Sequence, residues 1–364
     1  MKEKLLSIIV PSYNMEAYLP KCLGSLIIDN KELSQKLDVI VVNDGSKDRT
    51  SEIAHEFEAR YPGIFRVVDK SNGNYGSCIN AALAIASGEF IKVLDADDRF
   101  DAQSFAQMLG ILFDSECNSE QLDLLLTDFV TVDKNDEIVC YHTLPLPENN
   151  VCSVSDVKSF PSLYMHSIVY RTKNLRDIGY LQTEGISYTD NEWTFYPMIT
   201  IRNFKYLKLP VYRYLVGRQG QTIDPSVLKK SVWNHAIIAK RMTKELGVLR
   251  KNVGDVVYRY LEEVAIGMNV RVYNNVMLVL HNKESDQHLI EFDGMLAATS
   301  ETIHKKVMSR LFSRTIRFYY GAYWRKKQTS NTLVLMFFRL YRKLVVFVMS
   351  TLAWMRKGIW RGSF

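Results

Sequence analysis

Several patterns that would assign a function at once are missing from this chain of 364 residues. No G-x-G-x-x-G follows an apolar run and no G-x-x-x-x-G-K-[ST] occurs, so a dinucleotide enzyme and a P-loop NTPase both lack their main support. The absence of H-E-x-x-H and of any Cys/His cluster argues against zinc. The five cysteines are odd in number and scattered, which indicates reduced thiols. No signal peptide precedes the first apolar run, so we expect a catalytic domain on the cytosolic side.

Negative charge is missing from the C-terminal end of the chain. Residues 302–364 contain fourteen Lys and Arg and no Asp or Glu, whereas the remaining chain contains 32 basic and 40 acidic residues. A spanning helix at 333–355 would bury three cations near its middle, which is costly. A nucleic-acid arm rarely carries such apolar runs. Amphipathic helices on an anionic membrane surface therefore fit best, and a basic bundle packed on protein is the alternative.

Apolar runs alternate with amphipathic segments through the first hundred residues. The pattern predicts strands at 6–10, 39–42, 65–68 and 90–94, and helices at 15–28, 48–60 and 77–86. Short β-rich runs that alternate with helices predict an α/β sheet whose parallel strands are buried on both faces. We expect a catalytic domain over 1–224, a helical extension over 225–301 and the basic amphipathic helical tail over 302–364.

Three carboxylates in four positions, Asp95, Asp97 and Asp98, follow the fourth predicted strand. Carboxylates this close repel one another, and removing them from water without a partner costs several kcal/mol each, on the order of 2–7. At the carboxyl end of a strand in an α/β sheet, where ligands bind, Mg²⁺ or Mn²⁺ with a phosphorylated ligand would compensate them. The alternative is an acidic turn that caps the next helix, with Asp98 and Asp101 as cap candidates.

The segments Ile8–Asn14, Val41–Asp48 and Leu94–Asp98 resemble, in this order and spacing, the start of a family 2 glycosyltransferase of the GT-A fold. The resemblance extends over roughly residues 5–220. It implies a mostly parallel sheet flanked by helices, a nucleoside diphosphate sugar as donor, inverting transfer, and Mn²⁺ or Mg²⁺ as cofactor. The metal would offset the charge that builds on the leaving diphosphate.

The resemblance also implies roles for single residues. The positions that match the family's donor-binding residues are Pro11, Ser12, Tyr13, Glu16, Asp44, Gly73, Gly76 and Asp95. Asp44 matches the carboxylate that accepts a hydrogen bond from a uracil ring, and Asp97 matches the metal-holding end of the D-x-D motif. Ordinary turns are the alternative for the two glycines.

Two later segments carry further candidates. Asp190 is the better candidate for the base that deprotonates the acceptor, and Glu192 is its rival, because Thr189 stands where the family usually has Glu. A helix N-cap at 189–190 is the alternative. Arg218 could reach the diphosphate as a fork donor, followed on the same loop by Gln221 or Thr222, and a solvated Arg is the alternative. The missing Q-x-x-R-W pattern favours transfer of one sugar per encounter.

Together these features predict a membrane-associated hexosyl- or N-acetylhexosaminyltransferase. We expect it to move a sugar from a UDP-sugar to a lipid-linked saccharide acceptor. The reaction would take place at the cytoplasmic face of a bacterial membrane, as a step in cell-surface polysaccharide synthesis. One alternative is a sugar nucleotidyltransferase, which would require a Gly-rich start that this chain lacks. Another is a non-catalytic, transferase-like partner subunit at the membrane, against which the intact Asp97 and Asp190 argue.

Overall fold

The computed structural model describes residues 4–118, 121–218, 225–280, 282–311, 318–341 and 344. The chain divides into two compact units. The first consists of residues 1–227 and 245–264, and the second of residues 228–244 and 265–364.

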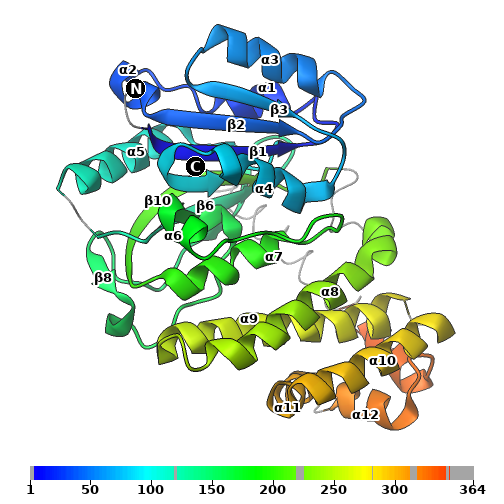
Figure 1. The fold of residues 1–364 in the computed structure, drawn as a ribbon. Coiled ribbons are helices and arrows are strands. Elements are labelled where there is room, and N and C mark those ends of the chain that lie inside the picture. Colours follow the sequence, from blue (N-terminus) through cyan, green and yellow to red (C-terminus); the bar gives the residue numbers. More distant parts are fainter. Residues whose placement is uncertain are drawn as a thin grey trace, which may run out of the picture. The chain divides into compact units, whose positions relative to one another are not determined.

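A ten-stranded sheet forms the centre of the first unit (Figure 1). Its main strand order is β3-β2-β1-β4-β9-β6-β10-β5, with β7 beside β6 and β8 beside β10. The strands are β1 Lys4–Ser12, β2 Leu37–Asn43, β3 Phe65–Asp69, β4 Gly88–Val93, β5 Arg99–Phe100, β6 Leu124–Val132, β7 Ile138–His142, β8 Val151–Ser153, β9 Ile168–Arg171 and β10 Asn203–Leu215. Strands β3, β2, β1 and β4 run parallel to one another, which confirms the predicted α/β fold, and β9 pairs antiparallel with β4.

Helices cover both faces of this parallel part of the sheet. In chain order the helices of the first two thirds are α1 Leu19–Gly24, α2 Lys31–Gln35, α3 Thr50–Arg60, α4 Asn74–Ile85, α5 Ala102–Cys117, α6 Thr172–Asp177 and α7 Asp190–Trp193. One core cluster joins Ile8, Val10 and Val39 to buried residues of α1, α3 and α5. Because successive strand residues point to opposite faces, α4, which packs on β1 and β2 outside this cluster, covers the other face.

The first helix is shorter than the sequence predicts. The residues from Met15 onward form a turn before α1, because two of their amides bond to side chains of the loop after β2. The Met15 N–H donates to Thr50 Oγ1 at 2.7 Å, and the Glu16 N–H donates to Asp48 Oδ2 at 3.0 Å. These bonds join the first two loops at the carboxyl edge of the sheet.

The remaining helices are α8 Pro225–Leu249, α9 Asp255–Asn275, α10 Lys283–Thr299, α11 Glu301–Arg310 and α12 Tyr320–Lys327, with a π-helical turn at Val276–Leu280. Helices α8 and α9 contribute residues to both units, and α10, α11 and α12 belong to the second. The long helices predicted at 225–246 and 253–281 are therefore confirmed. Among the described residues, no helix is long and apolar enough to cross a membrane.

A tight contact at Gly76 fixes the position of α4. A Cβ built on Gly76 would lie 2.1 Å from the carbonyl oxygen of Thr183, closer than any real contact. A few residues on, the Asn80 side chain also bonds to the backbone of Gln182, accepting from its N–H at 2.8 Å and donating to its carbonyl at 2.9 Å. The absence of a side chain at residue 76 thus lets the segment 182–183 lie directly on α4.

We expect Gly76→Ala to lower the free energy of unfolding by about 1–3 kcal/mol, since the added methyl must push Thr183 away from α4. Gly110→Ala in α5 is the matched control, because no atom lies within 4 Å of its built Cβ. Removing a helix-interior glycine there should raise stability by about 0.5–1 kcal/mol. Urea denaturation of both variants measures the difference, and equal effects would contradict the role of the contact.

Candidate active site

The acidic turn, Asp95 to Asp98, follows β4 and is held by groups from distant elements. Asp95 Oδ1 accepts a hydrogen bond from the Tyr75 hydroxyl at 2.9 Å. The Tyr212 hydroxyl of β10 accepts from the Asp95 N–H at 3.1 Å and donates to Asp98 Oδ2 at 2.7 Å. Asp98 Oδ1 accepts from the Leu215 N–H at 2.7 Å. The turn is therefore fastened to α4 on one side and to β10 on the other.

Asp98 does not cap the following helix. Asp101 occupies the N-cap of α5, where its Oδ1 accepts from the Ser104 N–H at 3.1 Å. Of the two cap candidates, the second is therefore confirmed. The Asp98 side chain is instead buried, and its two oxygens bond to Tyr212 and Leu215 of β10.

Negative charge within the acidic turn is only partly compensated. Burial, and after it the charge of Asp97, raises the pKa of Asp95 to about 7. Burial likewise raises the pKa of Asp98 well above its usual value. The Arg218 guanidinium forms an ion pair with Asp97. Since raised carboxyl pKa values mean that the fold disfavours the ionised forms, a further cation here would be bound favourably.

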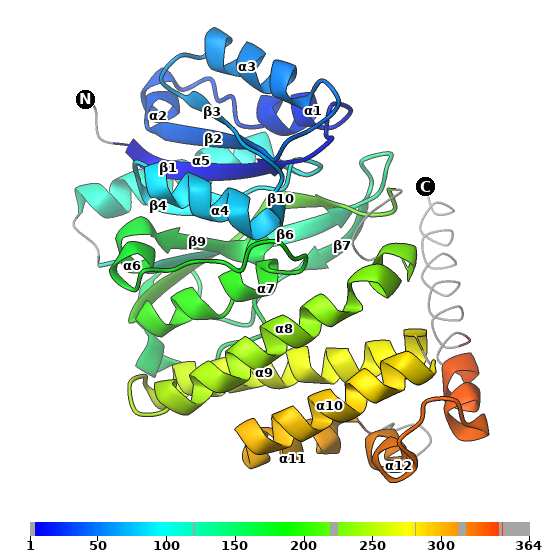
Figure 2. The same ribbon diagram turned by 45° about the vertical axis from the view of Figure 1, so that its right-hand side comes forward.

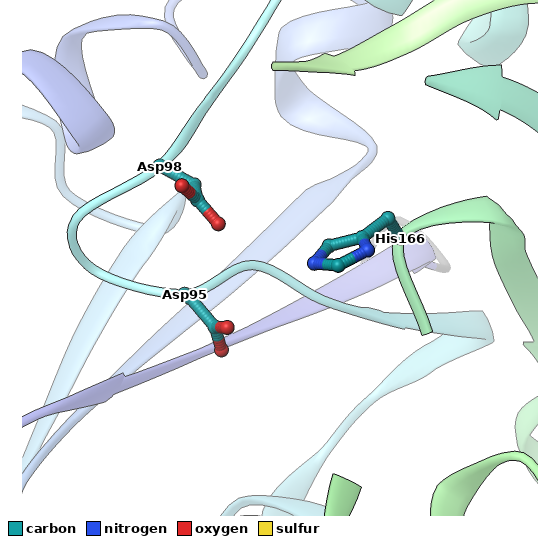
Figure 3. Close-up of side chains that lie close together, drawn as sticks. All are labelled: Asp95, Asp98 and His166. Atoms are coloured by element: carbon teal, nitrogen blue, oxygen red, sulfur yellow. The ribbon is translucent and has the colours of Figure 1, made fainter. Parts of the chain in front are cut away.

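A histidine from another segment faces the acidic turn. Figure 3 shows the His166 ring directed toward Asp95 and Asp98. Ligand atoms of these three side chains all lie within 4.8 Å of one another. Burial lowers the pKa of His166 to about 3, so its ring is neutral. Its buried Nδ1 has no hydrogen-bond partner among the described residues.

These three groups suit a divalent cation. Two carboxylates and a neutral imidazole are ligand types that Mn²⁺ accepts, and the carboxylates also suit Mg²⁺. The metal assignment to Asp97 stays a prediction, and this carboxylate already pairs with Arg218.

A buried lysine lies below the same turn. Lys92 of β4 is inaccessible to solvent, and its ammonium donates to the carbonyls of His166 at 2.7 Å and Ile168 at 3.2 Å. It also lies 5.7 Å from the ring centre of Tyr212. Burial lowers the pKa of Lys92 to about 7. Lys92 therefore fixes the backbone on either side of Ser167, which directs His166 toward the turn.

Helix α7 brings the candidate base Asp190 to this region. Asp190 is the first residue of α7 and is half-buried. The pKa of Tyr75 is raised by burial, then by the charge of Asp95, and then by the charge of Asp190. The charge of Asp190 is also a lesser cause of the raised pKa of Asp95. Helix α7 also packs on the segment Met165–Ser167, which carries His166, so Asp190 begins a helix that lies against the group facing the acidic turn. The Asn191 side-chain amide donates to Asp190 Oδ1 at 3.2 Å.

The rival base Glu192 has a different environment. Its side chain is inaccessible to solvent, and its two oxygens accept from the Thr183 N–H at 2.7 Å and the Thr183 hydroxyl at 2.8 Å. Thr183 in turn lies on Gly76 of α4. Glu192 thus fastens α7 to the segment that α4 supports. The two carboxylates point in different directions, as their spacing on a helix predicts.

The loops after β1, β2 and β3 bring together the predicted nucleoside positions. Asp44 is buried, and its Oδ1 accepts from Lys70 Nζ at 2.6 Å and from the Gly73 N–H at 2.9 Å. The Asp44 N–H donates to the Ser12 carbonyl at 2.8 Å. A Cβ on Gly73 would lie 2.6 Å from Ser77 Oγ, so the glycine makes room for the protein's own side chains.

The other predicted nucleoside residues lie around these loops. Pro11 lies in β1, opposite Val42 of β2. Tyr13 is 46% exposed and available to stack on a ligand. Glu16 Oε2 accepts from the Arg49 N–H at 3.0 Å, which places it on the second loop. The further loop candidates Gln221 and Thr222 lie outside the described residues.

Sequence reasoning did not identify Tyr75, Lys92, His166 and Tyr212 as parts of the site. A signal was present only for Lys92, since a lysine in the middle of an otherwise apolar strand must find a partner. The two tyrosines and His166 stand in segments whose position beside the turn depends on strand pairing, which local pattern does not reveal.

Comparisons with known proteins agree with this geometry. Residues 7–120 match the model of glycosyl transferase family 2. An uncharacterized glycosyltransferase of Mycoplasma pneumoniae is 40% identical over 106 residues, which are 29% of this chain and 35% of that protein. The putative glycosyltransferase EpsH of Bacillus subtilis is 27% identical over 229 residues, 59% of this chain and 62% of that protein. The matched part thus spans about a third of the Mycoplasma protein's length.

A solved structure shows the same fold. TarS of S. aureus in complex with UDP superposes with a TM-score of 0.59 at 20% identity, over 90% of this chain and 89% of that one. Its complex with UDP-GlcNAc gives a TM-score of 0.58 at 20% identity, over 84% and 85%. The sheet, with the acidic turn at its carboxyl edge, has the GT-A fold. Within that fold, residues 7–120 form a domain of glycosyl transferase family 2.

Tyr212→Phe should lower the free energy of unfolding by about 1–3 kcal/mol for each buried group left unpaired, namely the Asp95 amide and Asp98 Oδ2. Tyr214→Phe, two positions along β10, is the matched control. Its hydroxyl makes no recorded hydrogen bond within the described part of the chain, so its loss should change stability little. Thermal denaturation compares the two, and equally stable variants would show that Tyr212 does not hold the acidic turn.

Proposed function

We propose that this protein transfers a hexosyl or N-acetylhexosaminyl group from a UDP-sugar to a lipid-linked saccharide acceptor, with inversion at the anomeric carbon. The observation that carries the proposal is the packing of α7, which begins at Asp190, on the segment Met165–Ser167 that directs His166 toward the acidic turn, while Glu192 is buried against Thr183. One carboxylate near the donor-binding edge can therefore act on the acceptor.

Support for a uridine donor comes from the loops that surround Asp44. This carboxylate is buried and uses Oδ1 for both of its recorded bonds within the described residues. Its second oxygen could accept from the N3–H of uracil, which is a donor only in this base and its analogues. Tyr13 could stack on the ring. The relationship in fold to TarS, which was crystallised with UDP and with UDP-GlcNAc, agrees with this choice.

In the proposed reaction, Asp190 accepts the proton of the attacking acceptor hydroxyl, and the acceptor oxygen displaces the nucleoside diphosphate. Because a single displacement inverts the anomeric centre, one base suffices. Arg218, already beside Asp97, would donate to the departing diphosphate. Mn²⁺ or Mg²⁺ bound at the acidic turn would supply positive charge that stabilises this leaving group.

We expect Asp190→Asn to lower kcat by at least about a hundredfold with little change in donor affinity, because only proton transfer is lost. Glu192→Gln is the control. It should retain most of kcat but lose about 1–3 kcal/mol of stability, since one of the bonds from Thr183 lacks its acceptor. Steady-state kinetics and urea denaturation of both variants decide it. A large loss of kcat in Glu192→Gln alone would reverse the roles.

The metal and donor can be tested without turnover. UDP with Mn²⁺ should raise the melting temperature of the wild-type protein more than either ligand alone, because the cation joins the diphosphate to the acidic turn. Asp97→Asn should keep the fold and lose this joint effect, together with metal-dependent hydrolysis of a UDP-sugar. Parallel scans with GDP and CDP test the base. Full activity in excess chelator would exclude the metal role, and a larger shift with GDP would exclude uridine.

A further inference from the structure

The helix at 333–341 in the second unit is apolar on both of its faces. Figure 2 shows it, in orange-red, beside α12 and α10. Its inner face packs in the unit: Leu335 is inaccessible to solvent, and the Phe338 ring centre lies 4.7 Å from that of Tyr320. Arg339 donates to the Met277 carbonyl at 2.9 Å and to the Ser330 carbonyl. These contacts hold the helix on the second unit, and they determine which of its faces points away from the unit.

That opposite face, here called the outer face, is exposed and apolar. It consists of Leu333, Met336, Phe337, Leu340 and Leu344, which are 80%, 48%, 61%, 59% and 60% exposed. Spacings of three and four residues place them along one side of a helix. A continuous apolar row of this kind on a surface marks an interaction site, whereas single exposed apolar residues do not.

Positive charge accompanies the outer face. Arg325, Lys326 and Lys327 end α12 just before this helix, and all three are exposed. Lys305, Lys306 and Arg310 are exposed on α11. Ion pairs join Glu301 to Lys305 and Asp293 to Arg325. From residue 302 to the end, the sequence contains no acidic residue.

We propose that the outer face inserts into the surface of an anionic lipid bilayer, with the neighbouring lysines and arginines on the headgroups. Aliphatic and phenyl side chains beside cations are the pattern of an interfacial helix. Each cation near such a surface adds to the attraction. A second copy of this chain is a poor partner, because two outer faces would bring the cations at the end of α12 together. The proposal does not depend on the sugar transferred.

Flotation of the full chain with lipid vesicles tests this interface. The wild-type protein should float with phosphatidylcholine vesicles containing phosphatidylglycerol, and much less with phosphatidylcholine alone. Raising the salt concentration should weaken binding, since exposed charges are screened over roughly 10 Å at 0.1 M. The double variant Phe337→Ser, Leu340→Ser should reduce the partition coefficient at least tenfold. The double variant Lys326→Glu, Lys327→Glu should remove most of the preference for phosphatidylglycerol.

A matched control uses two exposed valines away from the outer face, Val139→Ser with Val248→Ser, which are 45% and 61% exposed in the wild type. This variant should float like the wild type. Equal flotation of the outer-face variant and the wild type would overturn the proposal. The proposal would also be overturned if light scattering showed that the wild-type protein is a dimer and the outer-face variant is a monomer. Hydrolysis of a UDP-sugar by every variant is measured alongside, so that failure of the membrane proposal is separate from failure of the proposed chemistry.

Discussion

The site is organised around buried negative charge at the carboxyl edge of the sheet. Asp95 and Asp98 have raised pKa values in the fold, so ionising them opposes folding. A carboxyl whose pKa is higher in the folded state than in the unfolded state binds its proton more tightly in the folded state, so it favours folding most at low pH. For Asp95, this contribution to stability falls as the pH rises from 3.8, the ordinary pKa, to about 7, the pKa in the fold. The hydroxyls of Tyr75 and Tyr212 and the charge of Arg218 offset the cost in part. The remaining negative charge favours binding of a cation at this turn.

Placement of Asp190, the proposed base, depends on a second chain of contacts, which links α4 to α7. Gly76 allows the Thr183 carbonyl to approach α4, and Thr183 then donates twice to Glu192. Two residues before Glu192, Asp190 begins α7 beside the acidic turn. A glycine that the family resemblance associates with the donor therefore has a direct packing role, and the rival base has a positioning role. Both roles are contacts within the protein that fix where α7 begins.

The second unit uses buried polar groups to fix helices whose apolar surfaces alone would allow several arrangements. Asp293 accepts from Tyr273 at 2.7 Å and is 2.8 Å from His304 Nε2, which joins α9, α10 and α11. Asp286 of α10 accepts from the Ser330 N–H at 2.9 Å, just before the helix at 333–341. Because a buried carboxylate requires its particular donors, these bonds select one packing. That packing decides which side of the final described helix stays exposed.

The sequence alone determined the parallel strands, the flanking helices, the acidic turn and the charge of the tail, because each depends on local pattern or on composition. It also indicated the family of the N-terminal domain, through three short motifs at fixed spacing. It left open which of Asp190 and Glu192 faces the turn and which of Asp98 and Asp101 caps α5. Only the tertiary structure buried the rival Glu192 against Thr183, selected Asp101, and brought His166, Tyr75 and Tyr212 to the carboxylates. The physical reason is that hydrogen bonds such as the one from Asp95 to Tyr212, 117 positions apart, depend on strand order and helix packing, which leave no trace in neighbouring residues.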